Sequence, residues 1–298
     1  MMNAKRYFYG YVAVIFSMIF WGVSFVWTKE LLNAKLPVFF ILLVRLFVSS
    51  LILFSFFSLT RKLDRVHRKD FPLFFLLALC EPFLYFLGEN FSMKYVDASF
   101  ASIMIAILPM ATSFALRIFN KEKFKWNLIV GVVVSIIGIL LMGMNEHFVF
   151  SASIEGVLLL VLAVVSGAGY SVVLSRLVYE YGPVTITTYQ NIIGTLLFLP
   201  CFLFFDMNKV HDIVWSWRII SDLLFLAVLC SSGAFILYSY SAKKLSIAKA
   251  SVFTNAIPVV TIVFAVLLGQ ETFTVMKTTG IVIVVSGLII SQIKIKNI

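Results

Sequence analysis

The chain alternates between long apolar stretches and short polar connections. Each stretch is close to the about 20 residues that a helix needs to cross a bilayer. Backbone groups in lipid must form hydrogen bonds within their own segment, so the stretches should be helices. The pattern therefore predicts an all-α integral membrane protein with ten transmembrane helices. The expected spans are residues 9–28, 38–59, 71–93, 98–118, 127–145, 156–178, 184–205, 221–241, 250–269 and 278–293.

The first span is expected to stay in the membrane as an anchor. Its apolar run is too long for a signal peptide, and Phe25, Val26 and Trp27 lead into Lys29 without a small-residue cleavage pattern.

The second half of the chain repeats landmarks of the first half at one constant spacing. These are Pro109, Glu122, Gly131 and Gly138, which recur about 149 positions later as Pro258, Glu271, Gly280 and Gly287. Five spans precede the midpoint and five follow it, so the second copy should enter the membrane in the opposite sense. We expect repeats at 9–145 (helices 1–5) and 156–293 (helices 6–10). Inverted repeats are typical of secondary transporters, which work by alternating access around a site at the membrane midplane.

Charge supports a membrane location and assigns an orientation. Only 13% of residues are charged and 61% are hydrophobic, whereas soluble proteins have about 25% charged residues. If the N-terminus is cytoplasmic, 17 of the 24 lysines and arginines lie in cytoplasmic loops and 6 lie outside, with Arg45 inside a span. Cytoplasmic loops carry such an excess, so both termini should be cytoplasmic. The net charge of +10 is then explained by membrane orientation and does not indicate a nucleic-acid partner.

Residues that often carry enzyme chemistry are scattered. Cys80, Cys201 and Cys230 lie within apolar spans without metal-ligand spacing, and we expect them to be small buried residues. The three histidines lie in loops, and no nucleotide-binding, zinc-protease or serine-nucleophile motif is present. The sequence therefore predicts no metal site, no cofactor and no enzymatic activity.

Several short motifs resemble a known family. They are Phe20-Trp21-Gly22, Lys94-Tyr95-Val96-Asp97-Ala98-Ser99, Ile107-Leu108-Pro109 and Asn120-Lys121-Glu122 in the first copy, and Ser246-Ile247-Ala248-Lys249-Ala250-Ser251, Ile257-Pro258 and Gly269-Gln270-Glu271 in the second. Each copy resembles an EamA domain, and the chain is similar to ten-helix transporters of the drug/metabolite transporter superfamily. Asn120 departs from the glycine that the family prefers there.

The resemblance implies an architecture and a broad range of substrates. Helices 1–4 and 6–9 should line a central cavity, and helices 5 and 10 should pack at the periphery. Substrates in this superfamily include amino acids, other metabolites, nucleosides and drugs. A multi-pass protein of a prokaryotic cell (inner) membrane is expected.

Three ionisable residues inside spans are candidates for the site, because each costs at least about 2.5–3.5 kcal/mol to insert. Arg45 is about 12 Å from the outer surface and Glu81 about 15 Å from the inner one, at 1.5 Å per residue. Both should therefore lie near mid-membrane. Glu89 should lie nearer the outer mouth, and Tyr85 shares its helical stripe with Glu81. Asn90 is adjacent to Glu89.

Two interpretations of these groups remain open. Glu81 could carry a proton or bind a cationic group of the solute, or a permanent Arg45–Glu81 ion pair could merely hold two helices together. Pro82 removes a helix hydrogen bond, which either frees a carbonyl for a ligand or only kinks the helix.

Further polar and aromatic groups are candidates at similar depth. Asn191 occupies the position of Arg45 in the second copy. The other candidates are Trp21, Tyr170, Gln190, Tyr238 and Asn255. Glu122 and Glu271 should instead cap or anchor helix ends, and the repeated glycines should serve close helix packing.

The site combines acidic and basic groups, which suits a small organic solute such as an amino acid or related metabolite. A protonatable Glu81 favours proton coupling over pure facilitation. The alternatives are a flippase for a lipid-linked head group, a membrane-embedded enzyme and a receptor. The expected partners are the solute and the lipid bilayer, with the protein a monomer or a weak homodimer.

Overall fold

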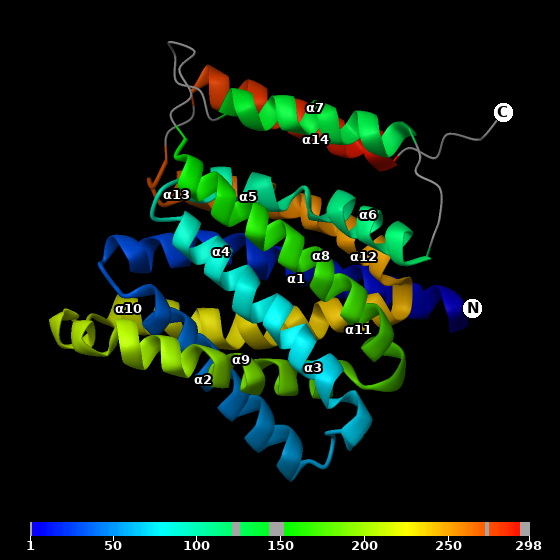
Figure 1. Ribbon diagram of the computed structural model, residues 1–298, viewed down its shortest axis with the longest axis vertical. Helices are drawn as coiled ribbons and strands as arrows, with labels where there is room; N and C mark the ends of the chain where they lie inside the picture. Colours follow the sequence, from blue (N-terminus) through cyan, green and yellow to red (C-terminus); the bar gives the residue numbers. More distant parts are fainter. Residues whose placement is uncertain (1, 121–125, 143–151, 272–273, 293–298) are drawn as a thin grey trace.

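The computed structural model describes residues 2–120, 126–142, 152–271 and 274–292. Over these residues all regular secondary structure is helical, and the long helices form a bundle (Figure 1). Eight helical segments are long and apolar enough to cross a membrane. They are Tyr7–Asn33, Val38–Leu59, Arg68–Ser92, Ala98–Ile118, Ile154–Glu180, Pro183–Phe205, Trp217–Leu245 and Ile247–Leu267.

Each half of the chain contains long unbroken helices followed by segmented ones. The first half contains α1 (Met2–Asn33), α2 (Val38–Leu59), the 3-10 turn η1 (Arg68–Asp70), α3 (Phe71–Ala78), η2 (Leu79–Leu84), α4 (Tyr85–Ser92), α5 (Ala98–Ile105), α6 (Leu108–Asn120) and α7 (Trp126–Met142). The second contains α8 (Ile154–Glu180), α9 (Pro183–Phe205), the 3-10 turn η3 (Met207–Asp212), α10 (Trp217–Phe225), η4 (Leu226–Ala234), α11 (Phe235–Leu245), α12 (Ile247–Val252), the 3-10 turn η5 (Phe253–Ala256), α13 (Ile257–Leu267) and α14 (Val275–Gln292).

The expected spans 71–93 and 221–241 each contain a wide π-helical turn. The first turn, η2, joins α3 to α4, and the second, η4, joins α10 to α11. In η2, Pro82 has no N–H to donate, and Glu81 has an extended backbone with φ −149° and ψ 118°. π-Helical turns in α-helices are frequent at functional sites, and here they recur at matching positions of the two halves.

The outer surface is apolar and the interior carries polar groups. On α2, Phe47, Leu51 and Phe54 are exposed, whereas Arg45 and Ser49 are buried. Exposed apolar side chains are stable when lipid, rather than water, surrounds the helices. This arrangement is that of a multi-pass membrane protein.

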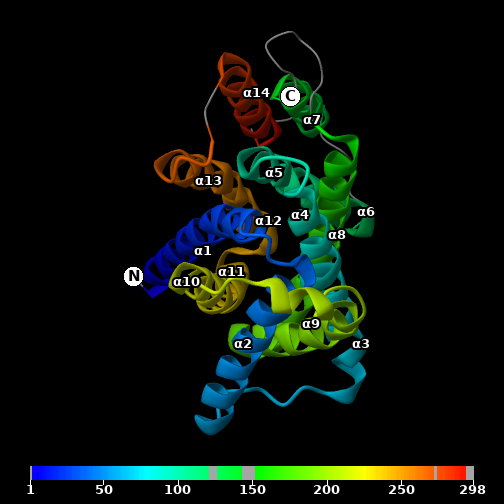
Figure 2. The same ribbon diagram turned by 90° about the vertical axis from the view of Figure 1, so that its left-hand side faces the viewer.

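Helices α7 and α14 pair with each other at one side of the bundle (Figures 1 and 2). A Cβ atom on Gly138 would lie 2.8 Å from the Gly280 carbonyl oxygen, and one on Gly287 would lie 2.7 Å from that of Gly131. The glycines therefore let the two backbones approach closely, as expected from their spacing. Because the early glycine of each helix faces the late glycine of the other, the two helices run antiparallel.

Equivalent helices of the two halves make equivalent contacts. Helix α4 packs on α8 while its counterpart α11 packs on α1, and α6 packs on α8 while α13 packs on α1. The core thus lies where the two halves meet.

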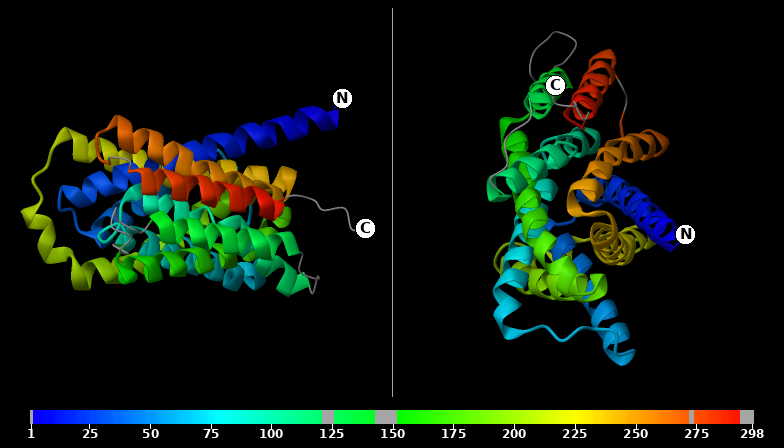
Figure 3. Two further views of the ribbon diagram at one scale, coloured as in Figure 1. Left: turned by 90° about the horizontal axis from the view of Figure 1, so that it is seen from above. Right: turned by 90° about the vertical axis from the view of Figure 1, so that its right-hand side faces the viewer.

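The N-terminal end of α1 and the C-terminal end of α14 lie at the same end of the bundle (Figure 3).

Candidate functional site

A cavity lies at the meeting of the two halves. Its empty volume is about 490 Å³. Its lining comes from α1, α2, η2, α4, α5, α6, α8, α11, η5 and α13. The lining residues are Trp21, Ser24, Phe25, Arg45, Glu81, Tyr85, Phe86, Glu89, Ile105, Leu108, Tyr170, Ser171, Tyr238, Thr254 and Ile257.

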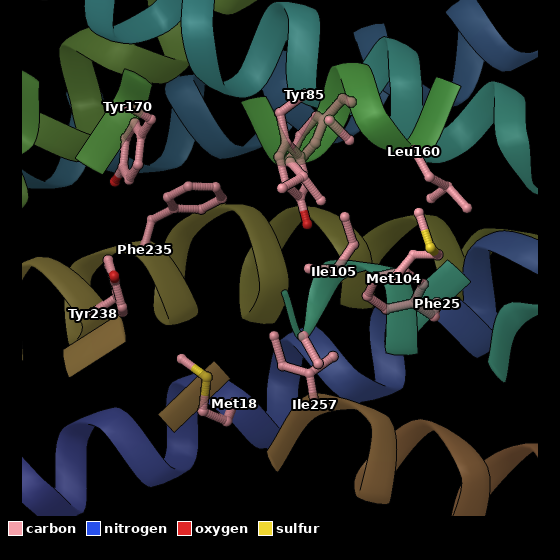
Figure 4. Close-up of a cluster of buried hydrophobic side chains, with 14 of the residues drawn as sticks. Met18, Phe25, Tyr85, Met104, Ile105, Leu160, Tyr170, Phe235, Tyr238 and Ile257 are labelled. Atoms are coloured by element: carbon pink, nitrogen blue, oxygen red, sulfur yellow. The ribbon is translucent and has the colours of Figure 1, made fainter. Parts of the chain in front are cut away.

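Aromatic side chains from different helices converge on this space. Tyr85, Tyr170 and Tyr238 project into a common layer with Phe235 (Figure 4). The Trp21 ring lies 5.0 Å from that of Phe235 and 5.1 Å from that of Tyr238, measured between centroids. Such rings give the cavity π-faces that can contact an ammonium group.

Glu81 brings a buried carboxylate to the cavity. Its side chain is buried, on the extended backbone of η2, immediately before a cis bond to Pro82. Within the described part of the chain, no side chain or backbone group donates a hydrogen bond to this carboxylate. Glu81 can therefore offer its carboxylate oxygens to a ligand.

Arg45 is held in the same cavity by neutral groups. Its Nε donates a hydrogen bond of 2.9 Å to Ser231 Oγ, and its guanidinium carbon lies 4.2 Å from the centre of the Phe86 ring. Its Nη1 is buried without a hydrogen-bond partner. Among the described residues, no carboxylate lies within the 4.0 Å of an ion pair with Arg45. The sequence left open whether Arg45 and Glu81 form a permanent ion pair. In this structure they do not.

Glu89 is more strongly tied to the protein than Glu81. Asn90 Nδ2 donates to the Glu89 carboxylate at 3.1 Å and also to the Phe86 carbonyl at 3.0 Å. Tyr85 also interacts with this carboxylate. The two acids therefore have different environments within one cavity, and Asn90 lies behind Glu89 rather than on the cavity wall.

The polar candidates of α9 lie outside the cavity lining. Asn191 Nδ2 donates hydrogen bonds of 2.7 Å to Ser49 Oγ and to the Ser231 carbonyl. It thereby contacts the same residue that holds Arg45. Gln190 is fully buried beside Tyr170. Asn255 is half-buried, and its neighbour Thr254 lines the cavity instead.

Sequence reasoning missed Ser231 and Phe86, the two groups that position Arg45. A signal for Ser231 exists in the repeat: Cys80-Glu81-Pro82 aligns with Cys230-Ser231-Ser232, so Ser231 occupies the position of Glu81. Phe86 had no such signal, because the chain contains 31 phenylalanines.

The end of the bundle where α5 begins is closed by polar contacts. Lys29 Nζ donates to the carbonyls of Met93 and Val96 at 2.7 and 3.0 Å. Glu271 accepts a hydrogen bond of 3.0 Å from the backbone N–H of Ser99 in the first turn of α5, so it caps that helix as expected. Its repeat counterpart, Glu122, lies outside the described residues.

Two similar helical halves around a cavity lined by charged and aromatic residues are the architecture of a membrane transporter. The chain matches the EamA-like transporter family over residues 8–144 and again over residues 154–292. Because the two matches span most of the chain, this protein belongs to that family. It is a transporter rather than an enzyme, and small molecules and membrane lipids are the partners of such a protein.

Relatives and one solved structure agree with the family. An uncharacterized transporter of Archaeoglobus fulgidus is 24% identical over 94% of this chain and 97% of its own length. The uncharacterized transporter YetK of Bacillus subtilis is 23% identical over 98% of this chain and 89% of its own. A protein of Streptantibioticus cattleyicolor, named a probable terminal-alkyne amino-acid exporter, is 26% identical over 67% of this chain and 66% of its own length. One crystal structure shares the fold, with a TM-score of 0.66 and 14% identity over 97% of this chain and 96% of that chain.

Proposed function

We propose that this transporter moves a small organic solute, an amino acid or related metabolite, by alternating access. The observation that carries the proposal is the enclosed cavity where Glu81, Glu89 and Arg45 meet aromatic side chains. Buried carboxylates and a buried guanidinium suit a ligand that itself bears both charges. The name of the Streptantibioticus relative, an amino-acid exporter, supports the same class.

The proposed moving units are the two repeats, residues 9–145 and 156–293. In this scheme α7 and α14 complete a set of ten transmembrane helices. Both termini face the cytoplasm of a prokaryotic cell. The antiparallel contact of α7 with α14 supports an inverted arrangement of the repeats, and the closeness of the two terminal helix ends supports a common side for both termini.

Proton coupling through Glu81 is part of the proposal. The Glu81 carboxylate faces the cavity without a hydrogen-bond donor, so protonation there would alter the charge that the solute meets. Glu89 is less suited to this role because Asn90 and Tyr85 already contact it.

A flippase for lipid-linked head groups is the alternative function. An apolar groove with an empty volume of about 840 Å³ lies between α1, α9 and α11, lined by residues such as Tyr9, Phe16 and Leu237. It shares no lining residue with the polar cavity. A flippase would need a head-group cavity that opens sideways into lipid.

Flux measurements on purified protein in liposomes test the function. Uptake of radiolabelled amino acids, nucleosides and organic cations would be measured with and without a pH gradient, and protein-free liposomes serve as the control. We expect amino-acid flux that responds to the gradient. Flux of nucleosides or cations alone would reject the proposed substrate, and gradient-independent amino-acid flux would reject proton coupling.

A further inference from the structure

Arg45 is an uncompensated cation in the interior of the protein. Its side chain is 1% exposed, yet within the described residues no carboxylate lies within ion-pair distance. A buried charge without a partner is costly, and buried charges in proteins are normally paired. An anionic group of a solute bound in the neighbouring cavity would supply the contact partner that Arg45 lacks.

The guanidinium is fixed through Nε, and among the described residues neither of its terminal nitrogens donates a hydrogen bond. Ser231 Oγ accepts from Nε, and the Phe86 ring covers one face of the guanidinium group. Nη1 remains buried and unpartnered. Ser231 and Phe86 are both uncharged, so they hold the Arg45 side chain in position without neutralising its charge.

We propose that Arg45 is the receptor for the carboxylate of the solute, with Ser231 as its positioning residue. The ammonium group of the solute then binds at Glu81, beside the rings of Trp21 and Tyr238. This inference rests on the proposed transport function and specifies its substrate class: zwitterionic amino acids with an apolar side chain.

The apolar requirement comes from the remaining cavity wall. Phe25, Ile105, Leu108 and Ile257 supply side chains without charge or hydrogen-bonding groups. A charged or amide side chain on the solute would lose its hydration there without gaining partners. A dianionic ligand such as a phosphate would face the carboxylates of Glu81 and Glu89, which would repel it. A simple amine has no anionic group, so it would leave Arg45 without an ion-pair partner.

Three ligands that differ by one charged group separate these alternatives. L-Leucine carries both groups, isoamylamine lacks the carboxylate, and 4-methylpentanoate lacks the ammonium. Binding of each would be measured by calorimetry on the purified full-length protein in nanodiscs at pH 7. We expect leucine to bind at least about tenfold more tightly than either analogue, because hydrogen bonds to charged groups are the stronger class.

Variants test whether Arg45 binds the carboxylate of the solute. Arg45→Gln should abolish the preference for leucine over isoamylamine and keep the preference over 4-methylpentanoate. Ser231→Ala keeps the guanidinium group but removes the acceptor that holds its Nε, and it should reduce the preference for leucine over isoamylamine by several-fold. Lys29→Gln is the matched control, because it removes a half-buried cation of α1 that does not line the cavity, and both preferences should persist.

Each remaining outcome contradicts the inference. A leucine preference that survives both Arg45→Gln and Ser231→Ala would remove Arg45 from carboxylate recognition. If Arg45→Gln does not fold, Ser231→Ala alone decides, and an unchanged ratio there overturns the assignment. Tighter binding of isoamylamine than of leucine, or no binding of any of the three compounds, would overturn the substrate class. The liposome flux screen decides separately whether the protein transports another solute.

Discussion

Glu81 and Arg45 share one cavity but do not neutralise each other. If they formed a permanent pair, removing one would leave the other buried and unpaired, a change that typically costs about 3–5 kcal/mol. In this structure Arg45 is held by Ser231 and Phe86 instead. Glu81 is therefore available for chemistry without being needed for the stability of Arg45.

This arrangement predicts the behaviour of Glu81→Gln. The variant should fold with a melting temperature close to that of the wild type, because no ion pair is lost. Transport, or its dependence on pH, should be abolished, because an amide cannot take up and release a proton. Flux in liposomes across a range of pH values and thermal unfolding of the same preparation provide the two measurements.

Glu155→Gln serves as the matched control, since Glu155 is an exposed acid in the first turn of α8. A stable Glu81→Gln protein with unchanged, pH-dependent flux would remove Glu81 from the mechanism. A destabilised protein whose stability and flux are both restored by adding Arg45→Leu would reduce the two residues to a packing role.

The sequence could propose which residues share a site, but not their contact partners. Counting residues from the ends of two spans led to the prediction that Arg45 and Glu81 lie at similar depth, and both line one cavity in the structure. Ser231 lies 186 positions from Arg45, and only the packing of α2 against η4 brings them together. The same packing places Asn191 behind Arg45, in a network that a count along one helix cannot reveal.

At the scale of elements, proline accounts for part of what the hydropathy pattern could not show. Apolar stretches predicted helices of the right length, because burial in lipid depends on side-chain polarity alone. Their interruptions depend on backbone geometry. Pro82 lies in η2, and Pro109 and Pro258 lie at the starts of α6 and α13. The wide turn η4 contains no proline, so its position could be recognised only by its equivalence to η2.

The contact between α7 and α14 depends on glycine and can be tested directly. In Gly138→Ala the new Cβ would lie 2.7 Å from the Val284 backbone nitrogen and 2.8 Å from the Gly280 oxygen, so the two helices must separate. We expect a loss of about 1–3 kcal/mol, the usual cost of overpacking. Thermal unfolding in detergent, followed by tryptophan fluorescence, measures it.

Gly233→Ala is the control for that substitution. It adds the same methyl group at a glycine of another helical segment. The new Cβ there would lie 3.5 Å from its nearest neighbouring atom, an ordinary contact distance. The melting temperature of this variant should stay near the wild-type value. Equal stability of the two variants would contradict the close approach of α7 and α14.

At the scale of the whole molecule, orientation in the membrane is the property to be tested. Chain direction and helix packing do not distinguish the two sides of a bilayer, whereas the charge bias of the loops does. In a cysteine-free background, Arg65→Cys should resist an impermeant thiol reagent added to intact cells and react in inverted vesicles. Lys209→Cys, in a predicted outer connection, should show the opposite pattern. Labelling of Arg65→Cys from outside would defeat the orientation.

The glycine contact between α7 and α14 also bears on the origin of the chain. It is self-complementary: Gly138 faces Gly280 and Gly131 faces Gly287, and each of these contacts becomes the other when the repeat equivalents, 149 positions apart, are exchanged. Two separate copies of a five-helix ancestor could have made the same contact, provided that they were inserted in opposite senses. Such an ancestor would have needed nearly balanced loop charges in order to insert both ways. Fusion into one chain would remove that constraint and leave each half free to acquire its own basic helix ends and loops, such as the pair Lys243 and Lys244 at the end of α11.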